Sequence, residues 1–501
     1  MIKKTFLSVA SSVALLGANA APAFASSKFF LVVPLKAQGQ VQEPAEAITV
    51  SLAGAALPKA TVNQAYSESL RPYLSVTGDA AFDPAAASWS LAEGALPEGL
   101  ALDGNTGAVA GTPMEKTTSS ASFTVRTSYK GQDGQAVYTI EVGGNVFQVS
   151  SISAGYGHTC AITVEGGVKC WGQNNYGQLG DISTAQRSIP VDVVGLTSGV
   201  ASVSTGSNHT CAVTTGGGVK CWGYNGHGQL GDNSTTDRIA PVDVSGLASG
   251  VASVSAGENH TCAVTTAGGL KCWGLNNYGQ LGDNSKTSRL TPVSVAGLLN
   301  EVASVEAGTF HTCAVTRAGG AKCWGHNGTG QLGDNSTTAR LIPVNVVGLT
   351  SGVTSVAAGT HHTCAVMAGA VMCWGYNSYG QLGDNRTTHR STPGTVLGLT
   401  SGIANVSAGG LHTCAVTIGG AAKCWGSNGN GQLGDNTTTS RLTSVDVFGL
   451  NSGVVSITAG DRHTCAVTTG AAKCWGYNGR GQLGNNSTID SSVPVDVKNL
   501  P

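Results

Sequence analysis

Histidine and cysteine recur together along most of this chain, in a pattern that could serve metal binding, redox chemistry or acid–base catalysis. The letters H-T-C-A, a short gap, C-W-G and then G-Q-L-G occur seven times, about every 51 residues. A period of this length is typical of repeat architectures, in which each unit buries its apolar face against its neighbours. All 14 cysteines fall into seven pairs within these repeats: Cys160 and Cys170, Cys211 and Cys221, Cys262 and Cys272, Cys313 and Cys323, Cys364 and Cys373, Cys414 and Cys424, and Cys465 and Cys474.

The spacing within the pairs favours disulfides over metal sites. Cys262 and Cys272 are symmetric about a glycine-rich turn, and Cys364 and Cys373 keep this symmetry although their turn is one residue shorter. Residues that face each other in a hairpin lie about 4.5–5.5 Å apart at Cα, which suits a disulfide. Zinc sites usually use cysteines two to four residues apart. We therefore predict disulfides, and no C-x-x-C motif suggests redox catalysis.

Each repeat also contributes one histidine and one tryptophan, and a ring of seven histidines could hold a metal or transfer protons. Active sites are asymmetric, whereas these residues recur in every repeat, so we predict structural roles, with each histidine hydrogen-bonded to backbone. The histidines are His158, His209, His260, His311, His362, His412 and His463. The tryptophans are Trp171, Trp222, Trp273, Trp324, Trp374, Trp425 and Trp475.

The sequence contains no known catalytic or cofactor motif that would indicate an enzyme. The chain has no G-x-S-x-G, H-E-x-x-H or G-K-[ST] segment. Four segments match G-x-G-x-x-G, but no helical period follows them, so they are predicted to be loop glycines. We expect no catalytic residue, no metal and no cofactor.

Opposite charges stand six residues apart in the long loop of six repeats. The pairs are Asp181 and Arg187, Asp232 and Arg238, Asp283 and Arg289, Asp334 and Arg340, Asp384 and Arg390, and Asp435 and Arg441. The seventh repeat has Asn485 and Ser491 instead, so both charges are lost together. This joint loss predicts ion pairs that order the loop, each worth about 0–1 kcal/mol if exposed.

The repeats are predicted to form a β-propeller. In the third repeat, strands are expected at 251–255, 261–265, 270–274 and 292–295, with the proline of the last one at its start. Four antiparallel strands repeated seven times are typical of propeller blades. At W-G-x-N-x-x-G-Q-L-G, the chain resembles the regulator of chromosome condensation repeat family, whose members form seven-bladed propellers. The resemblance covers about residues 147–499. The paired cysteines depart from the nuclear members and suit a bacterial secreted branch.

The N-terminus is predicted to be an export signal. Lys3 and Lys4 precede an apolar run over residues 5–16, and Ala23-Phe24-Ala25 offers a cleavage site after Ala25. Residues 1–25 are thus a predicted signal peptide and residues 26–45 a linker. Export to the periplasm, the cell surface or the medium would supply the oxidising conditions that disulfides need.

Residues 46–143 are predicted to form a small β-sandwich. Strands are expected at 122–127 and 136–142, with turns at 103–105 and 130–134. The segment L-P-E-G-L-A-L-D at 96–103, followed by T-G at 106–107 and G-T-P at 111–113, resembles immunoglobulin-like or cadherin-like modules of bacterial surface proteins. The predicted fold class is therefore all-β, a seven-bladed propeller (residues 147–499) preceded by an immunoglobulin-like sandwich.

The residues that differ between repeats predict where a partner binds. Loops after the first and third strands of each blade share one face, and they vary most. Asn208 and Leu411 belong to these loops, and the candidate binding residues are Tyr156, Tyr176, Tyr224, His227, Glu258, Tyr278, Phe310, His326, His361, Tyr376, Tyr379, Arg462, Tyr477 and Arg480. Tyr and Arg are favoured at binding hot spots. The alternative is drift of exposed loop residues.

Composition and pattern together predict a non-catalytic, secreted or cell-surface protein that binds a protein or a glycan. Charged residues make up only 11% of the chain and the net charge is −1, which excludes a basic nucleic-acid surface. We expect a monomer with no membrane span in the mature chain. The resemblance leaves two alternatives: a secreted inhibitor of an enzyme such as a β-lactamase, or guanine-nucleotide exchange on a small GTPase after delivery into a host cell. An enzymatic propeller is a further alternative.

Overall fold

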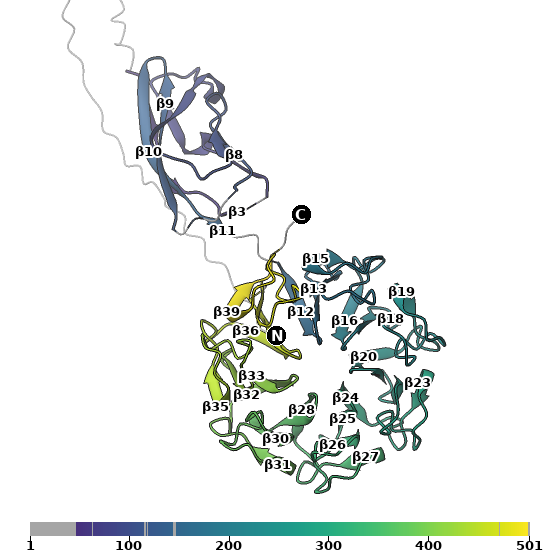
Figure 1. Cartoon of the computed structure of the whole chain (residues 1–501). Helices are drawn as coiled ribbons and strands as arrows, with labels where there is room; N and C mark the ends of the chain where they lie inside the picture. Colours follow the sequence, from purple (N-terminus) through teal and green to yellow (C-terminus); the bar gives the residue numbers. More distant parts are fainter. Residues whose placement is uncertain are drawn as a thin grey trace, which may run out of the picture.

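The computed structural model describes residues 47–498, apart from residues 63, 115, 116, 118, 144–146 and 470. The predicted signal peptide and linker lie outside the described residues. Two β regions are present, and Figure 1 shows the second as a closed ring of blades around a central channel. Each of its seven blades is one four-stranded antiparallel sheet built from strands consecutive in sequence.

The blades repeat almost residue for residue. The inner strands are β12 (Val149–Ala154), β16 (Val200–Thr205), β20 (Val251–Ala256), β24 (Val302–Ala307), β28 (Val353–Ala358), β32 (Ile403–Ala408) and β36 (Val454–Ala459). The second strands are β13 (His158–Thr163), β17 (His209–Thr214), β21 (His260–Thr265), β25 (His311–Thr316), β29 (His362–Met367), β33 (His412–Thr417) and β37 (His463–Thr468). The third strands are β14 (Val168–Gly172), β18 (Val219–Gly223), β22 (Leu270–Gly274), β26 (Ala321–Gly325), β30 (Ala370–Gly375), β34 (Ala422–Gly426) and β38 (Ala471–Gly476). The outer strands are β15 (Arg187–Asp192), β19 (Arg238–Asp243), β23 (Arg289–Ser294), β27 (Arg340–Asn345), β31 (Arg390–Thr395), β35 (Arg441–Asp446) and β39 (Ser491–Asp496).

The predicted strands of the third repeat are found, with one correction. The outer strand β23 begins at Arg289, so Pro292 lies inside it and not at its start. The ladder between β22 and β23 is irregular between its pairs Cys272–Val293 and Gly274–Arg289. Because β23 is an edge strand with an irregular ladder, a residue without an N–H is tolerated there.

Apolar side chains are buried between blades, not within one. Trp273 of blade 3 shares a cluster with Cys211, Leu230 and Val244 of blade 2, and the same grouping recurs around the ring. This agrees with the repeat principle, since an isolated blade would leave its apolar faces in water.

The N-terminal β region has its own core. Its strands are β1 (Thr49–Leu52), β2 (Ala55–Ala56), β3 (Ala60–Thr61), β4 (Tyr66–Ser69), β5 (Leu74–Thr77), β6 (Ser88–Gly94), β7 (Leu100–Leu102), β8 (Ala108–Gly111), β9 (Ala121–Tyr129), β10 (Gln132–Ile140) and β11 (Val142–Gly143), with short 3₁₀ turns at Arg71–Tyr73 and Pro84–Ala86. Trp89, Phe123 and Tyr138 are buried in its centre. The turn expected at 130–134 is tighter than predicted, because only Lys130 and Gly131 leave the strands, both with positive φ.

No helix among the residues that the structure describes is long and apolar enough to cross a membrane.

One residue of blade 1 has a backbone conformation that its side chain disfavours. Ile182 has a φ of 58°, at a position where the other blades place Asn, for example Asn233 and Asn284 at 60°. A left-handed backbone costs a β-branched residue roughly 1–2 kcal/mol, whereas Asn tolerates it. We expect Ile182→Asn to raise the free energy of unfolding by about 1 kcal/mol, measured by urea denaturation.

A second isoleucine provides the matched control for this prediction. Ile489 is 77% exposed and lies outside the positive-φ positions, so Ile489→Asn should leave the unfolding free energy nearly unchanged. Equal effects of the two substitutions would contradict the assignment of strain to Ile182.

Candidate functional site

The cysteine pairs form seven disulfides in the structure. Cys262 and Cys272 face each other in the register of β21 and β22, and the shorter pair Cys364 and Cys373 does so in β29 and β30. The Cα atoms of all seven pairs are 4.1 Å apart, and all fourteen side chains are fully buried. They are therefore part of the core, not a reactive surface.

The motif histidines and tryptophans join each blade to the next. His209 Nε2 lies 2.9 Å from Thr261 Oγ1 of the following blade. Thr261 Oγ1 donates to the Gln229 carbonyl oxygen, which also accepts from Trp273 Nε1. The expected hydrogen bond from histidine to backbone is thus wrong in detail: a threonine hydroxyl stands between the ring and the carbonyl. The same network closes the ring, where His463 meets Thr159 and Trp171 meets Gln482.

This network fixes the protonation of the seven rings. Because the threonine hydroxyl donates its one hydrogen to the carbonyl, it must accept from histidine, so Nε2 carries the proton. Every Nδ1 is buried without a hydrogen-bond partner in the described part of the chain. Burial, with smaller contributions from neighbouring histidines at some positions, lowers the pKa of each ring from 6.5 to about 3. The rings are neutral connectors, unsuited to proton transfer near neutral pH.

The charge pairs of the long loops lie within single blades. Arg289 Nη2 is 2.8 Å from Asp283 Oδ2 in blade 3, and the pairs Asp232–Arg238 and Asp334–Arg340 are at 2.7 Å. Partial burial disfavours the charged form of Asp283, but hydrogen bonds from Ser285, Arg289 and Asn276 outweigh it and lower its pKa. These carboxylates thus organise the loop that carries the variable residues.

The pair of blade 5 is looser for a visible reason. Arg390 Nη1 lies 3.7 Å from Asp384 Oδ2. Gly394 replaces a larger residue of the outer strand, and the Arg390 guanidinium fills the space that a Cβ there would occupy. The guanidinium is therefore drawn away from the carboxylate.

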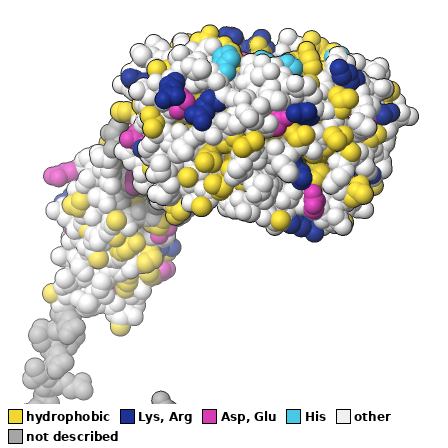
Figure 2. All heavy atoms as spheres, turned by 90° about the horizontal axis from the view of Figure 1, so that it is seen from below, with side chains coloured by type: hydrophobic (Ala, Val, Ile, Leu, Met, Phe, Trp, Pro, Cys, Tyr) yellow, Lys and Arg dark blue, Asp and Glu magenta, His cyan; other side chains and the backbone are white. Residues whose placement is uncertain are grey.

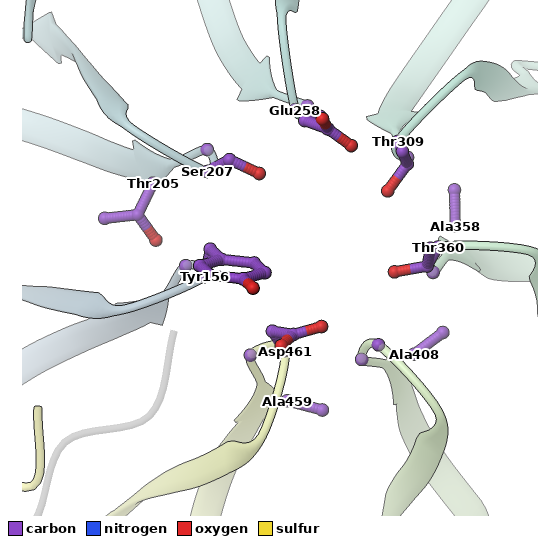
Figure 3. Close-up of a pocket in the computed structure, with 18 of the residues that line it drawn as sticks. Tyr156, Thr205, Ser207, Glu258, Thr309, Ala358, Thr360, Ala408, Ala459 and Asp461 are labelled. Carbon is purple, nitrogen blue, oxygen red and sulfur yellow. The ribbon is translucent and has the colours of Figure 1, made fainter. Parts of the chain in front are cut away.

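The loops after the first and third strands of every blade lie on one side of the propeller, which we call the variable face. At its centre, the residues that follow the A/T-G dipeptide of each inner loop surround a cavity of about 170 Å³, which we call the mouth. These residues are Tyr156, Ser207, Glu258, Thr309, Thr360, Gly410 and Asp461. Apart from Gly410, which has no side chain, these residues direct their side chains into the space between the blades (Figure 3).

A closed ring of backbone hydrogen bonds holds the mouth. The amide of Tyr156 donates to the Gly206 carbonyl of the next blade, and the amide of Asp461 returns to Gly155, with all seven N···O distances between 3.1 and 3.4 Å. Gly206 must lack a side chain, because a Cβ there would be 2.2 Å from the Gly257 carbonyl oxygen. The mouth is thus preorganised by backbone contacts.

Aromatic rings follow one another across the variable face from blade 3 to blade 5. Tyr278 lies 5.4 Å from Phe310 and 4.7 Å from His326 between ring centroids. Successive distances of 6.3, 6.1 and 4.7 Å then connect His326, His361, Tyr376 and His389. We call these six residues the aromatic arc. Figure 2, which views the propeller from its edge, shows histidine side chains in cyan along one rim.

The remaining predicted residues occupy other parts of the same face. The rings of Tyr176 and Tyr224 are tilted against each other with centroids 4.9 Å apart, and His227 lies 6.1 Å from Tyr224. The Arg480 guanidinium lies 5.7 Å from the ring of Tyr156. Tyr379 and Arg462 line a second cavity, and Tyr477 packs over Gly479.

The candidate residues of the inner loops occupy two different positions in the structure, although the sequence prediction treats them as one. Tyr156 and Glu258 line the mouth, whereas Phe310, His361 and Arg462 follow one residue later and stand outside it. His389 was missed because it lies far along the long loop; its Nδ1 accepts from the Asn377 amide, which holds it against Tyr376. Strict alignment of the seven repeats would have found the mouth residues.

Comparison with known proteins assigns the family. The RCC1-like domain model matches residues 129–401, more than half of the chain. The chain belongs to the RCC1-like domain family. RCC1 repeat models match further segments between residues 403 and 501, and the "Putative Ig domain" model matches residues 48–143.

Curated relatives share the repeats over part of their own length. The chain is 34% identical to the ultraviolet-B receptor UVR8 of Arabidopsis thaliana over 223 residues, 44% of this chain and 51% of UVR8. It is 36% identical to the probable E3 ubiquitin-protein ligase HERC4 of Mus musculus over 206 residues, 40% of this chain and 20% of HERC4. The chain thus spans about half of UVR8 and a fifth of HERC4.

Solved structures agree on the fold. Human WBSCR16 superposes with a TM-score of 0.59 at 24% identity, covering 66% of this chain and 93% of that one. Prp20p of Saccharomyces cerevisiae, whose structure was reported with its binding to Gsp1p and histones, gives 0.60 at 22% identity, covering 68% and 87%. The likeness at this identity shows the propeller fold alone.

Proposed function

We propose that this chain is an exported, non-catalytic binding protein that holds a protein or glycan partner against the variable face. The aromatic arc carries the proposal. Tyr278 of the arc is 40% exposed, and Tyr379, outside the arc on the same face, is 43% exposed. Rigid rings on preorganised loops lose little entropy on binding. The repeated histidines and tryptophans are buried connectors, so the face is where the blades differ.

Export is the second part of the proposal. The predicted signal peptide and the seven buried disulfides both suit an oxidising compartment. Origin in a bacterium stays a prediction from the N-terminal sequence, because the relatives named above come from a mouse and a plant.

Two alternatives use the same scaffold. An inhibitor would present the variable face to the active site of an enzyme, which is a special case of the proposal. Guanine-nucleotide exchange is supported only by the fold shared with Prp20p, and accelerated nucleotide release from a small GTPase would be its signature.

Capture experiments with matched variants test the proposal. We expect the mature protein to retain a defined partner from its native surroundings, and Tyr278→Ala/Phe310→Ala/Tyr379→Ala to lose it by at least about 10-fold, because hot-spot rings each contribute about 2 kcal/mol or more. The control carries Val164→Ala/Leu299→Ala/Ile418→Ala, three exposed apolar residues in loops of the opposite face. Equal loss in both variants, or loss in the control alone, would contradict the proposal.

A further inference from the structure

The mouth differs from the rest of the variable face in its charge. Of the described residues that line it, Glu258 and Asp461 are acidic and none is basic. Ser207, Thr309 and Thr360 add hydroxyl groups directed into the same space (Figure 3). A small cavity lined by carboxylates and hydroxyls offers hydrogen-bond acceptors to a positively charged donor.

The two carboxylates are not equally neutralised. Asp461 Oδ2 lies 3.3 Å from Arg462 Nε, whereas Glu258 Oε1 accepts only from the neutral Asn259 side chain, at 3.2 Å. Burial raises the pKa of Glu258, and the charge of Asp461 raises it further. Glu258 is therefore a carboxylate whose ionised form an incoming cation would stabilise.

A third carboxylate extends the negative charge along the channel wall. Glu306 lies on inner strand β24, immediately before the mouth residue Ala307, and accepts from Ser255 Oγ at 3.5 Å. Its side chain is exposed, but the surrounding inner strands reduce its hydration, which raises its pKa to about 7.

The arrangement of these groups favours an extended organic cation over a metal ion. Within the described residues, no three acidic, histidine or cysteine side chains come close enough to hold a metal. An ammonium or guanidinium group on a long side chain can instead reach one carboxylate at a time and satisfy its other donors with hydroxyls.

The aromatic arc begins at the edge of the mouth. Phe310 directly follows Thr309, and His361 directly follows Thr360, so ring surface and mouth are one residue apart in two adjacent blades. A ligand centred on the mouth would therefore meet apolar and aromatic surface on the side of blades 4 and 5.

We infer that the variable face takes a protein loop that presents a lysine or arginine, whose charged head enters the mouth while apolar neighbours lie on the aromatic arc. The inference rests on the proposed function and specifies its partner as a protein with a basic residue at the centre of its contact surface. Charge complementarity with Glu258, Asp461 and Glu306 supplies the specificity.

A pair of small probes tests the mouth without knowledge of the partner. Nα-acetyl-L-lysine amide and its uncharged counterpart Nα-acetyl-L-norleucine amide are titrated into the mature protein and followed by NMR. We expect the lysine probe to bind weakly, the norleucine probe to bind at least about 10-fold more weakly, and Glu258→Gln/Asp461→Asn to weaken the lysine probe by a similar factor. Glu165→Gln/Glu301→Gln, two exposed acids of the opposite face, should change nothing.

The outcomes separate this inference from the proposed function. Equal binding of both probes overturns the inference. Unchanged binding of the lysine probe to a Glu258→Gln/Asp461→Asn variant that unfolds at the same temperature as the unmodified protein also overturns it. If Tyr278→Ala/Phe310→Ala/Tyr379→Ala loses the captured partner while Glu258→Gln/Asp461→Asn retains it, binding at the variable face is supported and the cation site is ruled out. A captured glycan would also overturn the inference.

Discussion

Lowering the pH from 7.5 to 4.5 should destabilise the propeller steeply, even with all disulfides intact. Seven buried histidines have a folded-state pKa of about 3, against 6.5 when unfolded. Their contribution is complete above pH 6.5 and is lost as the pH falls toward 3, because only the unfolded chain binds protons in that window. In this window each histidine lowers the unfolding free energy by roughly 1.4 kcal/mol for every pH unit of acidification, so seven lower it by about 10 kcal/mol per unit. That is comparable to the whole stability of a typical domain.

Other titrating groups do not reverse this direction. Burial raises the pKa values of Glu258, Glu306 and Asp461, which favours the folded state as the pH falls, but these are three groups against seven. The loop carboxylates such as Asp283 have lowered pKa values and add to the acid loss below about pH 4.

Urea denaturation at a series of pH values measures the effect. The slope of the unfolding free energy against pH should correspond to the uptake of nearly seven protons on unfolding. The variant His260→Gln should take up about one proton fewer and should be less stable at pH 7. Gln can still donate from its amide toward Thr312, the partner of His260, but cannot titrate. An unfolding free energy that does not change between pH 7 and 5 would contradict the burial of the seven histidine side chains.

Loss of the disulfides should prevent the propeller from folding, although the folded protein should resist reduction. Each bridge closes a loop with a sequence separation of 9 or 10. Chain entropy assigns each such bridge about 2–3 kcal/mol, so seven together contribute on the order of 15–20 kcal/mol, an upper value. No free cysteine is present in the described chain, and the bridged side chains are fully buried, so a reductant reaches them only after blades open.

Alkylation followed by mass spectrometry checks both parts of this prediction. Dithiothreitol at neutral pH should leave the native protein unlabelled, and the same treatment in urea should expose all 14 cysteines. Protein refolded with reductant should lack a cooperative thermal transition. Cys262→Ala/Cys272→Ala should lower stability by only one bridge's share. An unchanged melting temperature after full reduction would contradict a stabilising role.

The repeated half of each blade could be predicted from sequence because its signals are local. Paired cysteines about a glycine turn specify the register of the second and third strands, and a proline near the edge marks the outer strand. Contacts between blades could not be predicted. The path from His209 through Thr261 to the Gln229 carbonyl joins residues from two repeats, and no spacing within one repeat reveals it.

The candidate site was only half accessible to sequence reasoning for a similar reason. Which loops share a face follows from strand alternation, so the aromatic residues could be named. The mouth depends on how seven loops converge, and Glu258 and Asp461 influence each other across two blades that are far apart in sequence. The arc likewise ends at His389, which only the folded loop brings against Tyr376.

Hydroxyl-radical footprinting of the complex with the captured partner tests most directly whether binding uses the variable face. Tyr278 and Phe310 should be protected at least several-fold on binding. Ile418 and Phe448, which are 76% and 61% exposed in loops of the opposite face, should be labelled equally with and without the partner. Protection of Ile418 and Phe448 with Tyr278 and Phe310 still labelled would contradict the account.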